Sequence, residues 1–248
     1  MKSMVSIMII ILFHMSCGYV EAYSRLDIDF ETGAVFSGYN DIRIPNEAGT
    51  DISFSEELKT DSTYFVRGKI NYSINDRHNF AIFAAPLRLE ATGKVNKPVF
   101  FEGIEFPANT RLKGKYRFDS YRFTYRYDFH PSERLTLGIG LTAKIRDAAI
   151  SIEDDIQKSE KLNTGFVPLI NFRVEWMPLS RISILLDGDA LAAPQGRAED
   201  ILLSTRFRIT KHISLKLGYR ILEGGADAES VYSFTLVHYI VLGSIVSF

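Results

Sequence analysis

The stretch Val231–Phe248, VYSFTLVHYIVLGSIVSF, decides between the fold classes open to this chain. It is nearly long enough for a single transmembrane helix. Val, Ile, Tyr, Phe and Thr dominate it, however, and these residues favour strands. Only His238 could carry a charge, and no Lys or Arg follows to anchor a helix end among lipid headgroups. We therefore interpret the stretch as a strand, and the rest of the chain tests that interpretation.

Composition narrows the classes further. A chain of 248 residues suits a single all-β barrel. The formal net charge of −1 gives no bulk field that would attract nucleic acid. Mean hydropathy is near zero, which excludes a polytopic helical membrane protein. It does not exclude a membrane barrel, whose polar interior offsets its lipid-facing side chains.

Residues 1–22 are predicted to be a signal peptide, followed by a barrel domain over 23–248. Lys2 supplies the positive start, an apolar core follows, and Val20-Glu21-Ala22 places small residues where a signal peptidase cleaves. Cys17, the only cysteine, lies inside this segment. A lipoprotein, acylated at Cys17, is the alternative. Cleavage after Ala22 would leave no cysteine for disulfide or thiol chemistry.

Beyond residue 25, apolar and polar residues alternate with a period of two, and no segment keeps a helical period. The clearest case is 120–127, where aromatic residues occupy the odd positions and Ser, Arg and Thr the even ones. Ten such segments predict an all-β fold, a ten-stranded antiparallel up-and-down transmembrane β-barrel. The predicted strands cover about 26–36, 61–73, 79–92, 116–129, 135–152, 164–177, 182–192, 200–209, 213–223 and 231–248.

Connection lengths indicate the orientation. Those after the first, third and fifth strands are predicted to be long, the last being a charged loop over 153–161, and a Gly-rich loop is predicted over 223–228. The remaining turns are short, and they would lie on the periplasmic side. A soluble lipocalin-like barrel is the alternative, because it shares the alternation.

Aromatic residues separate these alternatives, because membrane barrels carry them in two interfacial belts. The belt predicted at the periplasmic ends comprises Tyr72, Phe80, Tyr127, Phe129, Trp176, Phe207 and Phe248. The belt predicted at the outer ends comprises Phe36, Tyr64, Tyr116, Phe118, Phe166, Tyr232 and Phe234.

The predicted inward face is rich in charge. Buried charges must be paired, so the first interpretation is a network that fills a narrow lumen. Together with Asp27, twelve basic side chains face seven acidic ones, so a narrow anion-favouring, porin-like channel is the alternative. The predicted lumen network comprises Asp29, Glu31, Arg67, Lys69, Arg88, Glu90, Arg122, Arg126, Lys144, Arg146, Arg173, Glu175, Asp187, Asp189, Arg206, Arg208, Lys216 and Arg220.

An outer-rim hydrolase, as in omptin proteases or lipid A hydrolases, is a further alternative. Asp187 and Asp189 would share one strand face, about 7 Å apart from the strand rise. Such chemistry needs a histidine beside them. His78, His130 and His212 fall in predicted periplasmic turns instead. We therefore predict no enzyme, no catalytic residues, no metal site and no cofactor.

The two longest predicted loops, 38–60 and 93–115, carry scattered apolar residues, and the second could form a hairpin. They either pack on themselves and cap the barrel or bind an extracellular ligand of unknown identity. Their apolar residues include Ile42, Ile44, Phe54, Val99, Phe100, Phe101, Ile104 and Phe106.

The end of the sequence resembles the sorting signal of bacterial outer-membrane β-barrels. Gly243, Val246 and Phe248 match its glycine, hydrophobic and terminal aromatic positions, whereas Val241 departs from the usual polar residue. The resemblance implies insertion by the barrel assembly machinery and contact with outer-membrane lipids and lipopolysaccharide. The chain also resembles small barrels of about 250 residues without assigned activity. That likeness lies in Asn40–Pro45, Ala85–Arg88, Thr124–Tyr127 and Leu222–Asp227.

These observations lead to one interpretation. The chain is predicted to be a non-enzymatic bacterial outer-membrane barrel, structural or ligand-binding through its extracellular loops. The last strand should pair with the first. Since His238 shares parity with Phe248, we also predict a bulge between them that turns His238 toward the lumen.

Overall fold

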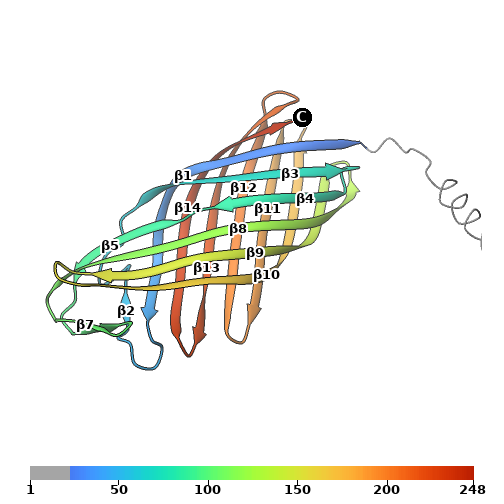
Figure 1. Ribbon diagram of the computed structural model, residues 1–248. Helices are drawn as coiled ribbons and strands as arrows, with labels where there is room; N and C mark the ends of the chain where they lie inside the picture. Colours follow the sequence, from blue (N-terminus) through green and yellow to red (C-terminus); the bar gives the residue numbers. More distant parts are fainter. Residues whose placement is uncertain (1–22) are drawn as a thin grey trace, which may run out of the picture.

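The structure is a computed structural model that describes residues 23–248. The predicted signal peptide, with Cys17, lies outside the described residues. Ten long antiparallel strands close into a barrel, as predicted (Figure 1). Within the described part of the chain, no helix is long and apolar enough to cross a membrane.

The wall of the barrel is formed by consecutive strands. They are β1 (Ser24–Arg43), β3 (Thr63–Ile74), β4 (His78–Ala85) continued by β5 (Arg88–Lys94), β8 (Arg111–Ser132), β9 (Leu135–Glu153), β10 (Lys158–Leu179), β11 (Ile182–Ala193), β12 (Gly196–Arg208), β13 (Ile213–Ala228) and β14 (Val231–Ser247). Three short strands, β2 (Ile52–Ser53), β6 (Val99–Phe101) and β7 (Ile104–Phe106), lie in the connections.

Val231–Phe248, the stretch quoted at the start, contains β14 and closes the barrel. β14 pairs with β1 from Asp27↔Ser247 to Arg43↔Tyr232. Leu26 and Phe248 exchange two backbone hydrogen bonds, of 3.2 and 2.9 Å, at the end of this ladder. Both chain ends of the barrel therefore lie at one end, which we call the turn end; the opposite end is the loop end. The strand interpretation of Val231–Phe248 is confirmed.

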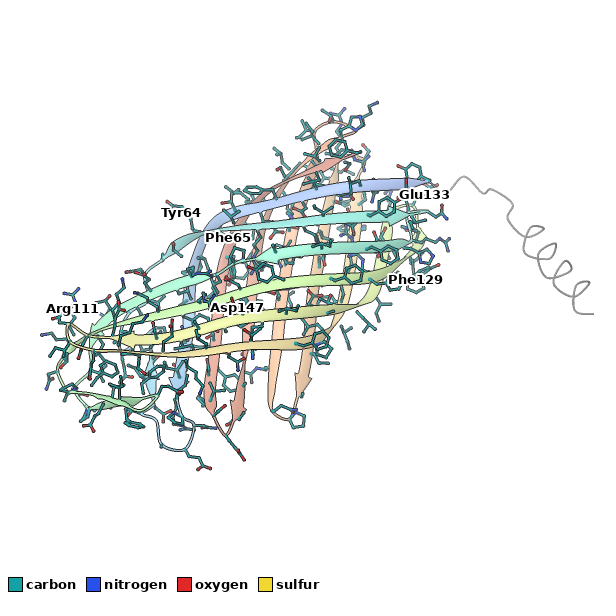
Figure 2. The ribbon with its side chains drawn as sticks, viewed as in Figure 1. Tyr64, Phe65, Arg111, Phe129, Glu133 and Asp147 are labelled. Carbon is teal, nitrogen blue, oxygen red and sulfur yellow. The ribbon has the colours of Figure 1, made fainter. Side chains whose placement is uncertain are left out.

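Alternation sorts side chains between the two faces of the wall. On β3, the Tyr64 side chain points outward and is 85% exposed, whereas Phe65 points inward and is 4% exposed (Figure 2). The outward band is apolar over most of the barrel height, with exposed residues such as Ile82, Phe123 and Leu141. An exposed apolar band around a closed barrel is the surface that a membrane covers.

The aromatic residues follow this sorting only in part. Phe129, Trp176 and Phe248 are exposed at the turn end, as predicted. Tyr116 and Phe118 were expected in the outer belt, but Tyr116 is buried inside the barrel. The part of β8 that carries Tyr116 and Phe118 lies beyond the outward apolar band. There the apolar side chains of β8 point into the barrel.

Two predicted loops are strand. β9 and β10 run on through 153–161 and leave only residues 154–157 as a turn, and 223–228 belongs to β13. We call residues 111–119 of β8, 147–153 of β9 and 158–165 of β10 the loop-end extension. Most of its outward positions are polar, including Lys115, Arg117 and Glu153, and Leu162 is an exposed apolar exception. Ladder pairing joins the three strand segments of the extension to one another, and its polar outward positions suit water rather than lipid.

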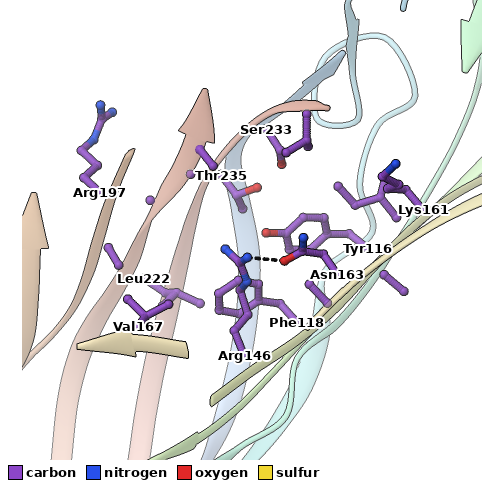
Figure 3. A pocket seen from close by; sticks show the side chains of 18 of the residues that line it. Tyr116, Phe118, Arg146, Lys161, Asn163, Val167, Arg197, Leu222, Ser233 and Thr235 are labelled. Atoms are coloured by element: carbon purple, nitrogen blue, oxygen red, sulfur yellow. Dashed lines mark hydrogen bonds between the residues drawn. The ribbon is translucent and has the colours of Figure 1, made fainter. Parts of the chain in front are cut away.

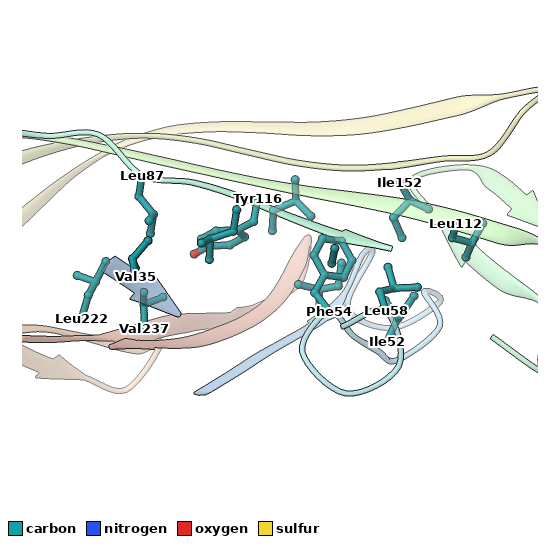
Figure 4. Close-up of a cluster of buried hydrophobic side chains, with 14 of the residues drawn as sticks. Val35, Ile52, Phe54, Leu58, Leu87, Leu112, Tyr116, Ile152, Leu222 and Val237 are labelled. Carbon is teal, nitrogen blue, oxygen red and sulfur yellow. The ribbon is translucent and has the colours of Figure 1, made fainter. Parts of the chain in front are cut away.

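An apolar cap fills the loop end of the interior (Figure 4). Ile44, Phe54 and Leu58, from the first long connection, pack against Leu112 and Ile152 of the extension, and each is at most 1% exposed. The second long connection forms the β6–β7 hairpin, as predicted. Of the apolar loop residues singled out above, Ile42, Ile44, Phe54, Val99, Phe101 and Phe106 are buried and Phe100 and Ile104 are partly buried.

The predicted inward turn of His238 is wrong. β14 keeps an unbroken register with β13, and the neighbouring Val237 and Tyr239 are fully buried on the inward side. His238 therefore faces outward, where it stacks with Phe36 and Tyr219 at centroid distances of 5.4 and 5.9 Å. Its Nδ1 hydrogen-bonds the Tyr219 hydroxyl at 2.5 Å. This bond satisfies the polar edge of the ring, so no bulge in β14 is required.

Candidate functional site

Alternation places most of the predicted lumen residues inside the barrel. The residues that point inward, buried or half-buried, are Asp29, Glu31, Arg67, Lys69, Arg122, Arg126, Lys144, Arg146, Arg173, Glu175, Asp187, Asp189, Arg206, Lys216 and Arg220.

Three predicted members lie elsewhere. Arg88 and Glu90 are exposed on the outside of β5, because the intervening Leu89 points into the apolar cap. The Arg88 guanidinium pairs with Asp119 instead. Arg208 has the inward parity but is exposed at the turn end, where its Nη2 lies 3.7 Å from the Met177 sulfur.

The centre of the network is a residue that sequence reasoning missed. Asp200 on β12 accepts hydrogen bonds from Arg67 at 3.0 Å, Arg122 at 2.5 Å and Arg220 at 2.5 Å. All four side chains are at most 7% exposed. Asp200 shares the parity of Arg206, so extending the predicted inward face of β12 toward its start would have found it.

A second group of ion pairs lies beside the first. The Lys216 ammonium donates to Asp29 at 2.8 Å and to Glu31 at 2.6 Å. Arg220 bridges to the first group by donating to Glu31 at 2.8 Å. Gly243 makes room for this arrangement, since a Cβ there would lie 2.8 Å from Cε of Lys216.

A third group extends toward the turn end. Arg173 donates to Glu175 at 2.5 Å and to Asp187 at 3.4 Å. Lys69 donates to Asp187 at 3.2 Å, and Arg206 pairs with Glu175. The remaining void among these groups is about 40 Å³, the volume of one or two waters.

Asp187 and Asp189 do not form a rim pair with a histidine. Asp189 accepts hydrogen bonds from Arg122 at 2.8 Å, Thr142 at 2.7 Å and Asn171 at 2.9 Å, inside the network. Every histidine in residues 23–248 lies in a turn-end segment or, for His238, on the outer face. Among these residues no cluster of three or more His, Cys, Asp or Glu could hold a metal ion.

Two inward cations stand apart from this network. Eight others pair with carboxylates: Arg67, Lys69, Arg122, Arg126, Arg173, Arg206, Lys216 and Arg220. Among the described residues, no carboxylate lies within 4.0 Å of Lys144 or Arg146. Lys144 is 2% exposed, and its ammonium lies 4.8 Å from the centroid of the Phe118 ring. Arg146 donates to the Asn163 amide oxygen, and its buried Nε has no partner (Figure 3).

Both cations line one cavity at the loop end, which we call the rim cavity. It has a volume of about 100 Å³ and lies between β8–β10 on one side and β12–β14 on the other. Apolar side chains such as Val167 and Leu222 share the lining with polar ones, including Thr235 and the Arg197–Glu223 ion pair (Figure 3). The cavity therefore combines a partly apolar lining with two cations that pair with no carboxylate of residues 23–248, since the Glu223 carboxylate in the lining is taken by Arg197.

The barrel wall is split beside this cavity. β10 and β11 pair only from Ile170↔Ala190 toward the turn end. Within the described chain, residues 158–169 of β10 pair with β9 alone, and the last residues of β11 pair with β12 alone. We call this gap the β10–β11 seam. Val167, which lines the rim cavity, lies on its β10 edge.

No protein-family model matches this chain, and no curated protein matches it in sequence. Solved structures match the fold. The outer-membrane protease OmpT from Escherichia coli aligns with a TM-score of 0.55 at 8% identity, over 90% of this chain and 97% of OmpT. Ail, the attachment invasion locus protein of Yersinia pestis, gives 0.40 at 9% identity over 90% and 99%.

The outer membrane protein OprG from Pseudomonas aeruginosa gives a TM-score of 0.40 at 10% identity, over 92% of this chain and 97% of OprG. At such identities the likeness concerns the fold and not the activity. The closed ten-stranded wall, the outward apolar band and the match to OmpT lead to the same conclusion: this chain has the fold of a small bacterial outer-membrane β-barrel.

Proposed function

We propose that this protein is a non-enzymatic outer-membrane barrel with a closed lumen, serving structure or ligand binding at its outer end. The observation that carries the closed lumen is the Asp200 network. Three arginines from three strands converge on one carboxylate at mid-height. Buried ion pairs of this kind hold side chains in place, because separating them would leave a charge in a low-dielectric interior.

The position in the membrane follows from the surface. The turn end, with both termini, lies in the periplasm, and the loop-end extension projects outside among lipopolysaccharide headgroups. Gly243, Val246 and Phe248 present the sorting signal to the barrel assembly machinery, and the signal peptide is cleaved near Ala22. Heat-modifiable migration on a denaturing gel and recovery with outer-membrane fractions test this placement; a soluble protein that migrates alike boiled and unboiled would contradict it.

Planar-bilayer recording tests the closed lumen. Purified protein should show no steady ion-conducting steps, because paired side chains occupy the axis. The matched variant is Asp200→Asn, which frees three arginines, and it should raise the frequency of brief openings. Anion-selective steps from the unaltered protein would favour the channel and overturn the closed lumen.

The absence of enzymatic activity needs its own test. Asp187 and Asp189 are engaged with Lys69, Arg122 and Arg173, which supports a structural role for both carboxylates. Asp187→Asn and Asp189→Asn should leave envelope lipid profiles and surface proteolysis unchanged. A change in either readout with the barrel intact would indicate a hydrolase.

A further inference from the structure

We propose that the rim cavity binds a small amphipathic carboxylate, with the anion at Lys144 and Arg146 and an apolar chain or ring against Val167 and Leu222. The inference names a site and a ligand class for the ligand-binding part of the proposed function, on which it rests. The occupant is defined by the chemistry of the lining.

The charge of the cavity is the first argument. Isolated buried charges cost far more than paired ones, and the rest of this interior obeys that rule. Lys144 departs from this rule: its side chain is 2% exposed, its ammonium lies 4.8 Å from the centroid of the Phe118 ring, and it pairs with no carboxylate of the described residues. An incoming anion would neutralise Lys144 at the point where the protein itself supplies no carboxylate.

Arg146 makes a carboxylate the fitting anion. Its Nη2 is held by Asn163, which orients the planar guanidinium, while its buried Nε has no partner. A guanidinium edge matches the two oxygens of a carboxylate, and such charge-assisted bonds are stronger than neutral ones. Lys144 would add a second contact from the adjacent inward position of β9.

The apolar lining sets the rest of the ligand. A cavity of about 100 Å³ is somewhat smaller than the ~150 Å³ cavity that accommodates benzene. It therefore takes the carboxylate and a short chain, and a larger part such as a ring must extend through an opening. We place that opening at the β10–β11 seam, where the β10 edge at Val167 has no ladder partner on β11.

The experiment uses the complete barrel in nanodiscs of neutral phosphatidylcholine, and the probe is fluorinated phenylbutyrate, followed by fluorine NMR. The equally sized phenylbutanol and phenylbutylamine are compared with it. Phenylbutyrate should bind saturably, phenylbutanol at least tenfold more weakly, and phenylbutylamine not at all. Equal binding of the acid and the alcohol would overturn the proposal.

Variants separate charge from shape. Lys144→Met should weaken phenylbutyrate binding at least tenfold, and Arg146→Gln should weaken it similarly. Val167→Trp should abolish binding by filling the cavity while both cations remain. The matched control is Lys158→Met, which removes a half-exposed lysine on β10 outside the cavity and should leave the affinity unchanged.

Heat-modifiable migration verifies that each variant forms the barrel. Unchanged affinity in folded Lys144→Met and Arg146→Gln would refute the anion site. These results are independent of bilayer conductance, so a barrel that conducts ions yet binds phenylbutyrate refutes only the closed lumen. A silent barrel that does not bind phenylbutyrate refutes only the rim site.

Discussion

Arg122 on β8 and Lys144 on β9 are direct cross-strand partners, yet their surroundings differ. Arg122 donates to Asp189 at 2.8 Å and to Asp200 at 2.5 Å, whereas Lys144 has no carboxylate within the 4.0 Å ion-pair distance among the described residues. Both are buried, at 4% and 2% exposure. Alternation along the sequence predicts that both side chains point inward. The difference therefore comes from which carboxylates of other strands lie near each cation.

The difference shows that one barrel interior contains both a closed, ion-paired region and a cavity with unpaired cations. Where carboxylates from β11 and β12 reach the cations, the charges are satisfied and the lumen is closed. One step toward the loop end, no carboxylate of the described residues pairs with Lys144 or Arg146, and both cations face a cavity with a partly apolar lining. Substitutions at the two levels should therefore act with different sizes and even different signs.

The largest expected effect is that of Asp200→Asn. Three buried arginines lose their shared carboxylate, and breaking such a pair costs about 3–5 kcal/mol of the free energy of unfolding. Urea-induced unfolding in a lipid environment measures it. Asp147→Asn is the control, because its half-exposed pair with Arg117 should contribute only about 0–1 kcal/mol. A loss below 1 kcal/mol at Asp200 would show that the network does not stabilise the barrel.

Lys216→Met should rank next. The substitution leaves Asp29 without this partner and Glu31 with Arg220 alone. We expect a loss of about 3 kcal/mol in the same unfolding measurement, because a buried carboxylate remains unpaired. Little change in the free energy of unfolding would mean that water reaches Asp29.

Lys144→Met should act with the opposite sign. It removes a buried cation that has no carboxylate, so the free energy of unfolding should rise by about 1 kcal/mol. The comparison with Lys216→Met is the sharpest available, because the chemical change is identical. A loss of similar size in both variants would abolish the distinction between the two levels.

The smallest expected effect lies on the outer surface of the loop-end extension. A hydrogen bond from Lys115, 2.8 Å away, lowers the pKa of Glu153 and raises the pKa of Lys115. The contribution of Glu153 is present above its unfolded pKa of about 4.3 and is lost as pH falls through the lower folded value. That of Lys115 is present below its unfolded pKa of about 10.4 and is lost as pH rises through the higher folded value.

Carboxylate NMR titration checks this pair directly. In Lys115→Met the pKa of Glu153 should return toward its ordinary value, with hardly any change in stability, because the pair is exposed to solvent. An unchanged pKa of Glu153 in that variant would show that Lys115 does not cause the shift.

Alternation along the sequence was enough to predict the ten wall strands and which side chains face inward over most of the wall. Alternation is local, since successive side chains of a strand point to opposite faces whatever the strand pairs with. It predicted the closing role of Val231–Phe248 and the parity of Arg122 and Lys216. It misled at Arg88, where the apolar residues face a cap and not lipid.

Which inward residues meet depends on how the strands are arranged around the closed barrel. Arg67 and Asp200 are 133 positions apart, and their contact depends on strand tilt and stagger around the closed barrel. The same stagger leaves Lys144 and Arg146 beyond the reach of the carboxylates and opens the β10–β11 seam beside them. The His238 side chain points outward, where Phe36 and Tyr219 on the neighbouring strands lie beside it. Alternation along one strand cannot reveal such cross-strand neighbours.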